Sequence, residues 1–152
     1  MWKRTSLAMA GLGLALLATG LPSHLVAEQN GSDRPFVGVA AGAITGIAPD
    51  GAIVAEATGH ATHLGDFTRT EYVYVGLDGI SISGTVIFTA ANLDELWVDF
   101  EGGFTSQITA EGTYTITGGT GRFTDATGTA SFTAKLPDGI HLAVSFGGSV
   151  SY

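Results

Sequence analysis

The sequence predicts an all-β protein, a single antiparallel, up-and-down β-barrel of about eight strands. Three observations favour this fold. Turn signals recur at regular intervals, apolar and polar side chains alternate between them with a period of two, and no helical periodicity appears from Pro35 onward. Short sequential hairpins without a long crossover favour a barrel over a sandwich, and a closed barrel leaves no exposed edge strand.

The clearest turn signals are the Asp-Gly pairs, because a type I′ hairpin turn requires positive φ at both central residues. They stand at Asp50-Gly51, Asp78-Gly79 and Asp138-Gly139. Counting from turn to turn places the strand starts near Val37, Ala52, Phe67, Ile80, Glu95, Ala110, Gly128 and Ile140. The expected barrel domain spans residues 36–152 and follows a flexible leader at 28–35.

The alternation identifies the side of each strand that faces the core. The apolar sets expected inside are Ile80, Ile82, Val86 and Phe88; Leu96, Val98 and Phe100; Tyr114 and Ile116; Ala130, Phe132, Ala134 and Leu136; and Ile140, Leu142, Val144 and Phe146. On the second strand the inner set is Ile53, Ala55, Ala57, Gly59 and Ala61. Such small side chains leave volume for a ligand or for bulky neighbours.

Residues 1–27 are predicted to be a secretory signal peptide. A basic start precedes an apolar run, Leu7 to Ala18, that is too short to span a bilayer comfortably. Cleavage is expected after Gly20 or after Ala27, and an uncleaved membrane anchor is the alternative. After cleavage we expect a secreted, periplasmic or cell-surface protein without stable membrane insertion.

The absence of cysteine and the excess of acidic residues limit the partners that the protein can bind. The chain has no cysteine, which excludes disulfides and lipid attachment through a cysteine. Without the signal peptide it keeps four basic and 14 acidic residues, a difference of −10. Such a surface repels phosphate backbones and anionic headgroups, so a nucleic-acid partner is not expected. Association into homo-oligomers stays open.

The segment Gly118-Gly-Thr-Gly-Arg-Phe123, followed by Ala126 and Gly128, is predicted to be a structural corner between two strands. Glycine permits positive φ and close backbone approach, which lets Phe123 plug the barrel mouth. The corner residues are Gly118, Gly119, Gly121, Phe123 and Gly128. Arg122 is expected to pair with an acid across this corner, with Asp125 nearest in sequence.

The same segment resembles the allene oxide cyclase and dirigent group of barrels, which carry Gly-Gly-Thr-Gly-x-Phe followed by Ala-x-Gly. The resemblance implies an eight-stranded, calycin-type barrel with an apolar lumen; in the plant enzymes the barrel shapes a reactive intermediate. It carries no catalytic residue to this chain. Gly59 to Gly65 is similar to a segment of small exported bacterial proteins, and that likeness implies no activity.

The histidines are the first candidates for chemistry. His60 and His63 stand three residues apart and point to opposite faces of a strand, so a shared zinc ion is not expected, and neither a metal nor a cofactor is predicted. On a regular strand His63 points inward, where it would orient a ligand or act as a general acid or base. The alternative is a structural histidine bonded to backbone or threonine. The acids at 94–101 are expected to form a solvated face rather than a calcium site.

Other catalytic patterns are missing from the sequence. No Gly-x-Ser-x-Gly elbow appears, and no glycine loop precedes a helix, so neither a hydrolytic triad nor a phosphate site is predicted.

Three functional hypotheses follow. The first is a binding module that encloses a small apolar ligand, with His63, Phe88, Tyr114, Ile116 and Phe132 as candidate contacts. The second is a cyclase or isomerase that confines a reactive intermediate, with His63 and Tyr114 as candidate catalytic groups. The third is a structural cell-surface or matrix protein. A solidly packed lumen would exclude the first two.

Overall fold

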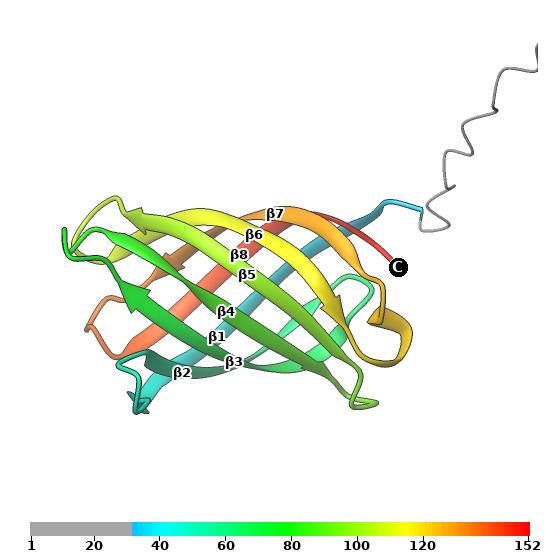
Figure 1. Ribbon diagram of the computed structural model, residues 1–152, viewed down its shortest axis with the longest axis horizontal. Coiled ribbons are helices and arrows are strands. Elements are labelled where there is room, and N and C mark those ends of the chain that lie inside the picture. The colour runs from blue at the N-terminus through cyan, green and yellow to red at the C-terminus, as the bar shows by residue number, and fades with distance from the viewer. Residues whose placement is uncertain (1–31) are drawn as a thin grey trace, which may run out of the picture.

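Eight antiparallel strands close into one barrel in the computed structural model, which describes residues 32–152 (Figure 1). Each strand pairs with the next along the chain, and β8 pairs with β1 to complete the sheet. The strands are β1 (Arg34–Ile47), β2 (Ile53–Ala61), β3 (Gly65–Val75), β4 (Ser81–Ala90), β5 (Glu95–Phe104), β6 (Thr109–Gly119), β7 (Thr127–Lys135) and β8 (His141–Ser151). The predicted up-and-down barrel is therefore confirmed.

The barrel begins slightly before its predicted boundary at residue 36. Arg34 pairs with Val150 and Pro35 pairs with Ser149, so the ladder between β1 and β8 includes the last two residues of the expected leader. The predicted signal peptide, residues 1–27, lies outside the described residues. Within residues 32–152, no helix combines the length and the apolar character needed to cross a membrane.

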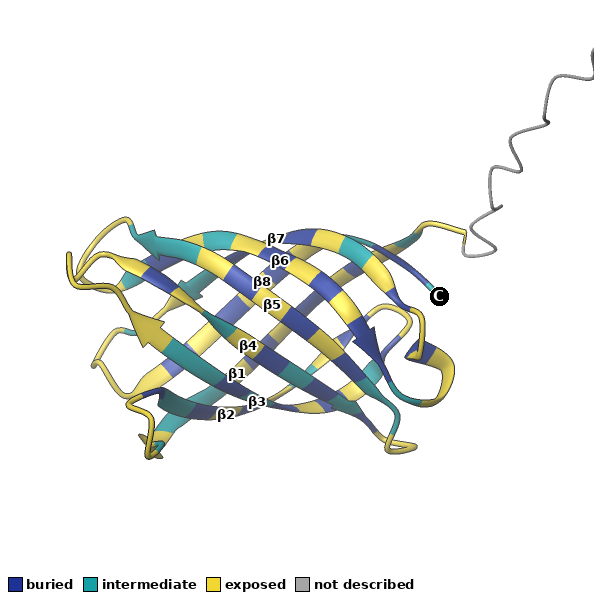
Figure 2. Cartoon of the chain, in the orientation of Figure 1, coloured by how far each residue is buried: buried dark blue, intermediate teal, exposed yellow. Residues whose placement is uncertain are grey.

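The strands bury one face and expose the other, as Figure 2 shows by the alternation of buried and exposed positions along each arrow. In β8, Leu142, Val144 and Phe146 are buried while the residues between them are exposed. This alternation has the period of two that the pleat of a strand imposes. It places the aromatic and aliphatic side chains in the lumen and most of the threonines and serines in solvent.

The two ends of the barrel are built differently. The connections β1–β2, β3–β4, β5–β6 and β7–β8 lie at one end, which we call the hairpin end. The connections β2–β3, β4–β5 and β6–β7 lie at the opposite end, together with the start of β1 and the end of β8 (Figure 1). We call this the corner end.

The β6–β7 connection at the corner end contains a short 3-10 helix, η1 (Gly121–Phe123). Phe123 is 1% exposed, and its ring packs edge-on against Tyr152 with centroids 4.9 Å apart. Gly121 has φ 55°, and a Cβ at this position would lie 2.0 Å from Oδ1 of Asp94. Glycine is therefore required here both by the backbone angle and by the space.

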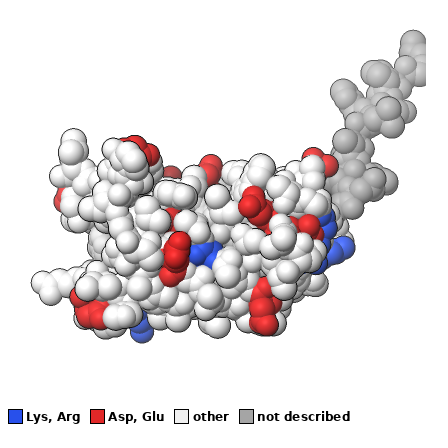
Figure 3. Space-filling model, turned by 90° about the horizontal axis from the view of Figure 1, so that it is seen from below, with Lys and Arg blue, Asp and Glu red and all other residues white. Residues whose placement is uncertain are grey.

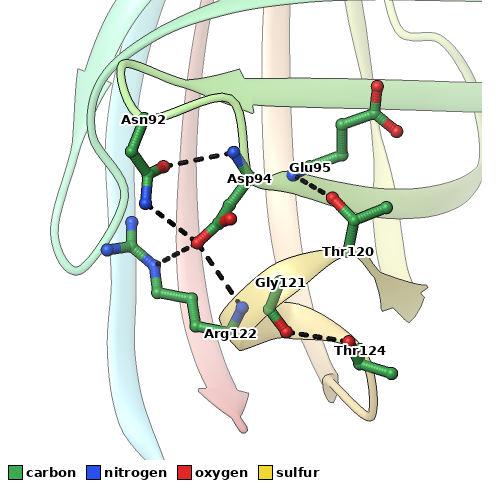
Figure 4. A network of polar contacts seen from close by, with 7 residues as sticks. All are labelled: Asn92, Asp94, Glu95, Thr120, Gly121, Arg122 and Thr124. Atoms are coloured by element: carbon green, nitrogen blue, oxygen red, sulfur yellow. Dashed lines mark hydrogen bonds and ion pairs between the residues drawn. The ribbon is translucent and has the colours of Figure 1, made fainter.

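Asp94 ties the β4–β5 turn to this corner (Figure 4). Its carboxylate accepts a hydrogen bond from the Asn92 amide at 3.0 Å and lies 3.8 Å from Nε of Arg122. The Thr120 hydroxyl meanwhile accepts a bond from the backbone N–H of Glu95 at 2.9 Å. Arg122 thus has an acidic partner across the corner as expected, and this partner is Asp94 of the neighbouring hairpin rather than Asp125, the acid nearest in sequence.

Candidate functional site

A cavity of about 440 Å³ occupies the half of the lumen that faces the hairpin end. It extends from the middle of the barrel to the turns at that end, since both mid-strand residues such as Phe100 and turn residues such as Pro137 border it. The apolar side chains that line it include Ile44, Ile53, Val73, Ile82, Phe104, Leu136 and Leu142. Its volume lies within the range typical of pockets for small ligands.

The other half of the lumen is filled with aromatic rings. Phe88 is fully buried and stands near the centre of this group, with ring centroids 5.1 Å from Phe67, 5.5 Å from Phe146 and 5.8 Å from Phe36. All three pairs have the edge-to-face geometry that aromatic quadrupoles favour. The packed half therefore forms a rigid base beneath the cavity.

Small residues on β2 make this arrangement fit. A Cβ on Gly59 would lie 2.6 Å from the tip of the Phe67 ring, so the ring occupies the space above the glycine. Nearer the hairpin end, Ala55 borders the cavity instead. The small inner residues of β2 thus leave room for a bulky neighbour, Phe67, in one half of the barrel and for open volume in the other half.

The boundary between the two halves is polar. Arg69 and Glu71, both on β3, are 2% and 8% exposed, border the cavity and form an ion pair through Nη2 of the arginine and Oε2 of the glutamate. The guanidinium carbon of Arg69 lies 5.3 Å from the centroid of the Phe88 ring and 5.9 Å from that of Tyr114. We call Arg69, Glu71 and Tyr114 the polar floor of the cavity.

The surroundings set the charge states of this floor. Burial acts to lower the pKa of Arg69, but the neighbouring Tyr114 and Glu71 side chains outweigh it, and the pKa lies above its ordinary value. Burial raises the pKa of Tyr114, against the opposing positive charge of Arg69. At neutral pH the floor therefore presents a guanidinium cation and an uncharged phenol.

His63 does not point into the lumen. β2 ends at Ala61, and His63 lies exposed in the following turn with φ 63°. The expectation of an inward histidine required a regular strand, and the strand is interrupted at Thr62. The hydroxyl of Thr62 donates to the carbonyl of Pro35 at 2.6 Å and accepts from the backbone N–H of Val37 at 3.0 Å. Thr62 is therefore held by the first residues of β1.

The other sequence candidates are divided between the two halves. Tyr114 and Phe132 both border the cavity, and their rings stack with centroids 4.6 Å apart. Phe88 and Ile116 are buried in the core but are not part of the cavity wall. The structure thus brings Tyr114 and Phe132 to one site and leaves His63 at the opposite end of the barrel.

Arg69 and Glu71 of the polar floor were not among the candidates from sequence, although a signal for them exists. Along β3 the residues Phe67, Arg69, Glu71 and Val73 share one face, with polar residues or Tyr72 between them. The period of two therefore places Arg69 and Glu71 inside. Two charged residues in an inward register are rare in a closed core, which makes this pattern a usable marker of a site.

Metal ligation finds no support in the part of the chain that the structure describes, where no three histidine, cysteine or acidic side chains gather closely enough to hold an ion. His60 lies exposed on the outer face of β2, and its Nδ1 is 2.8 Å from Oδ1 of Asp66 on β3.

Comparison with known proteins gives a limited result. No family model matches the chain, and no curated protein matches it. One solved structure that is similar is that of a pterocarpan synthase dirigent protein, with 12% sequence identity over 80% of this chain and 87% of that chain, and a TM-score of 0.49. The fold assignment accordingly rests on the strand ladders described above, and the site is interpreted from its own residues.

Proposed function

We propose that this protein is a binding module that encloses a small, mainly apolar molecule in the open half of its barrel without transforming it. The observation that carries this proposal is the cavity of about 440 Å³, whose wall is mostly aliphatic and aromatic and which borders the turns at the hairpin end. A preformed apolar cavity with a few polar groups is the usual form of a small-molecule site.

The rim of the cavity supports the same function. Exposed apolar side chains project from three of the four connections at the hairpin end: Leu77, which is fully exposed, and Ile80, Ile108 and Ile140. Apolar side chains grouped at one end of a small protein often mark a binding surface. An apolar rim favours the entry of an apolar molecule over that of a charged one.

The outer surface argues for a small molecule rather than a nucleic acid as the ligand. Figure 3 shows acidic side chains scattered over the face that it presents, with few basic ones among them. Secretion, or a periplasmic or cell-surface location, belongs to this proposal because the signal peptide predicted at residues 1–27 would direct it. Fractionation of the host, with detection of a chain that starts after residue 20 or 27, tests the location.

A second candidate function, catalysis by confinement, is favoured by the polar floor. With His63 at the other end of the barrel, the groups left to exchange protons with an enclosed cyclase or isomerase substrate are Tyr114 as acid and Glu71 as base. If such turnover exists, Tyr114→Phe should abolish it and leave ligand binding intact. A binding module predicts that the ligand is recovered unchanged from the wild-type protein.

The first test of binding is native mass spectrometry of the protein purified from its own host, in which we expect a small molecule to co-purify. The second is a titration with the apolar fluorophore N-phenyl-1-naphthylamine. Ala134→Phe fills part of the cavity wall, so it should weaken binding by roughly tenfold or more.

The matched control is Ala143→Phe, which adds the same ring to an exposed position of β8. It should leave the affinity for the fluorophore unchanged. Equal affinities of the wild-type protein and the Ala134→Phe variant, with both folded, would refute binding in the lumen.

A further inference from the structure

Two nitrogen atoms of the polar floor carry N–H groups that meet no acceptor in the part of the chain that the structure describes. An arginine carries five N–H bonds, and Arg69 directs its Nη2 group to Glu71. Nε and Nη1 together carry three further N–H bonds, and no group among residues 32–152 accepts a hydrogen bond from either nitrogen. Both unpaired buried atoms found in this part of the chain are therefore donors. What these two nitrogens of Arg69 lack within the described residues is an acceptor.

Such unpaired donors are costly, because a buried N–H that has lost water without gaining an acceptor retains its full desolvation penalty. The faces of Phe88 and Tyr114 offset part of this cost by cation–π attraction to the guanidinium. Arg69 nevertheless borders the cavity, so an enclosed molecule lies beside this side chain.

We propose that the ligand carries an uncharged carbonyl oxygen and that Arg69 binds this oxygen at the floor of the cavity. This inference rests on the proposed function and makes it more specific. The occupant is then an apolar molecule with a ketone, ester or amide group at its inner end, and its apolar remainder lies against the aliphatic wall toward the hairpin end.

The choice of a neutral carbonyl over a carboxylate follows from Glu71. The ion pair already neutralises Arg69, and the Glu71 side chain is 11% exposed. A second carboxylate would leave one negative charge uncompensated in a poorly solvated cavity, which is strongly unfavourable. A carbonyl oxygen offers lone pairs to the free N–H groups and adds no net charge.

Three probes of equal size and different head groups test the proposal: 4-phenylbutan-2-one, 3-phenylpropanoic acid and (3-methylbutyl)benzene. Their affinities for the wild-type protein are measured by calorimetry or by ligand-observed NMR at neutral pH. The ketone should bind roughly tenfold more tightly than the hydrocarbon, which is the lower end of what a hydrogen bond to a charged group contributes. The acid should bind less tightly than the ketone.

A double variant, Arg69→Met/Glu71→Met, removes both charges together, because a lone buried charge would endanger folding. It should bind the hydrocarbon within about twofold of the wild-type affinity and lose the preference for the ketone.

The outcomes distinguish failure of the carbonyl inference from failure of the binding module itself. Equal binding of ketone and hydrocarbon by the wild-type protein would overturn the carbonyl inference and leave the binding module standing, as would a ketone preference that survives in the double variant. Tighter binding of the acid than of the ketone by the wild-type protein would also overturn it. If neither hydrocarbon nor ketone binds, the binding module itself fails and the inference fails with it.

Discussion

Arg69 and Glu71 are unusual because they place two opposite charges inside a barrel whose other inner residues are mainly apolar. Replacing such a pair by well-packed apolar residues is often neutral or stabilising, so the pair is weak evidence for a contribution to stability. Its position on the wall of the cavity gives it a different meaning. A polar pair that borders an empty space is available to a ligand, whereas one sealed in a packed core is not.

A second residue-scale feature is the close approach of backbone at the corner. A Cβ placed on Gly119 would lie 2.1 Å from the carbonyl oxygen of Glu95 and 2.8 Å from Cβ of Phe123. Because backbone and the Cβ of the buried Phe123 meet the added methyl group, Gly119→Ala should lower the free energy of unfolding by about 1–3 kcal/mol. Urea unfolding followed by tryptophan fluorescence measures the change.

The control for this substitution is Gly46→Ala near the end of β1, where an added Cβ would meet nothing within 4 Å. It should change the free energy of unfolding by less than about 0.5 kcal/mol. Equal effects of the two substitutions would show that close approach at the corner is not what requires glycine there.

At the level of elements, the sequence predicted where the strands begin but did not predict that β2 ends at Ala61. The observed strands begin within three residues of their predicted starts. Alternation and Asp-Gly turns are local signals, and they agree with the fold throughout. The turn after Ala61 has no such signal, since Thr62 is held by a bond to β1, a strand distant in sequence. His63 was misplaced for this reason.

The cavity itself could not be predicted, because it depends on register and rotamers across several strands. Tyr114 faces Ala130 directly and stacks on Phe132, which is paired with Gly112. This diagonal contact exists only in the observed register. A shift of two residues would preserve every inward and outward assignment and still change which rings fill the lumen.

Two hairpin turns make the stability of the fold depend on pH, because each contains an aspartate whose pKa is lowered. In the β3–β4 turn the carboxylate of Asp78 accepts hydrogen bonds from the Ser81 hydroxyl and from the backbone N–H groups of Ile80 and Ser81, which lower its pKa from 3.8 to about 2. The pKa of Asp138 in the β7–β8 turn is also lowered, above all by the hydrogen bond from His141.

A carboxyl whose pKa is lower in the folded state adds stability above its unfolded pKa, and this stability is lost as the pH falls through the folded pKa. For Asp78 the window runs from about pH 4 to about pH 2. The difference in unfolding free energy between the wild-type protein and Asp78→Asn should therefore shrink across this window. Urea unfolding at pH 5, 3 and 2 measures it.

Thr85→Ala provides the comparison, because Thr85 is exposed on the outer face of β4, lies outside the turns and carries no titratable group. The difference in unfolding free energy between this variant and the wild-type protein should stay nearly constant over the same pH range. If the Asp78→Asn difference were equally constant, the turn hydrogen bonds would not carry the pH dependence.

For the whole molecule, closure of the sheet places the two ends of the described chain side by side. Arg34 at the start of β1 pairs with Val150 in β8, and the Ser151 hydroxyl donates a hydrogen bond to Asp33. A short flexible linker from Tyr152 to residue 32 therefore adds one more hairpin connection to the corner end. Chains with adjacent termini generally tolerate such circular permutation.

The position of the new termini then tests how the fold is organised. A permutant of residues 32–152 opened between Ser106 and Gln107 interrupts an exposed turn at the hairpin end, so it should keep the barrel's circular dichroism spectrum and a urea midpoint close to that of the unpermuted chain. A permutant opened between Arg122 and Phe123 cuts η1 and frees a ring that is 1% exposed. This second chain should be markedly less stable, because the corner then no longer holds Phe123 in the core. Similar midpoints for both permutants would mean that the corner connection does not stabilise the barrel and that its glycines serve only to turn the chain.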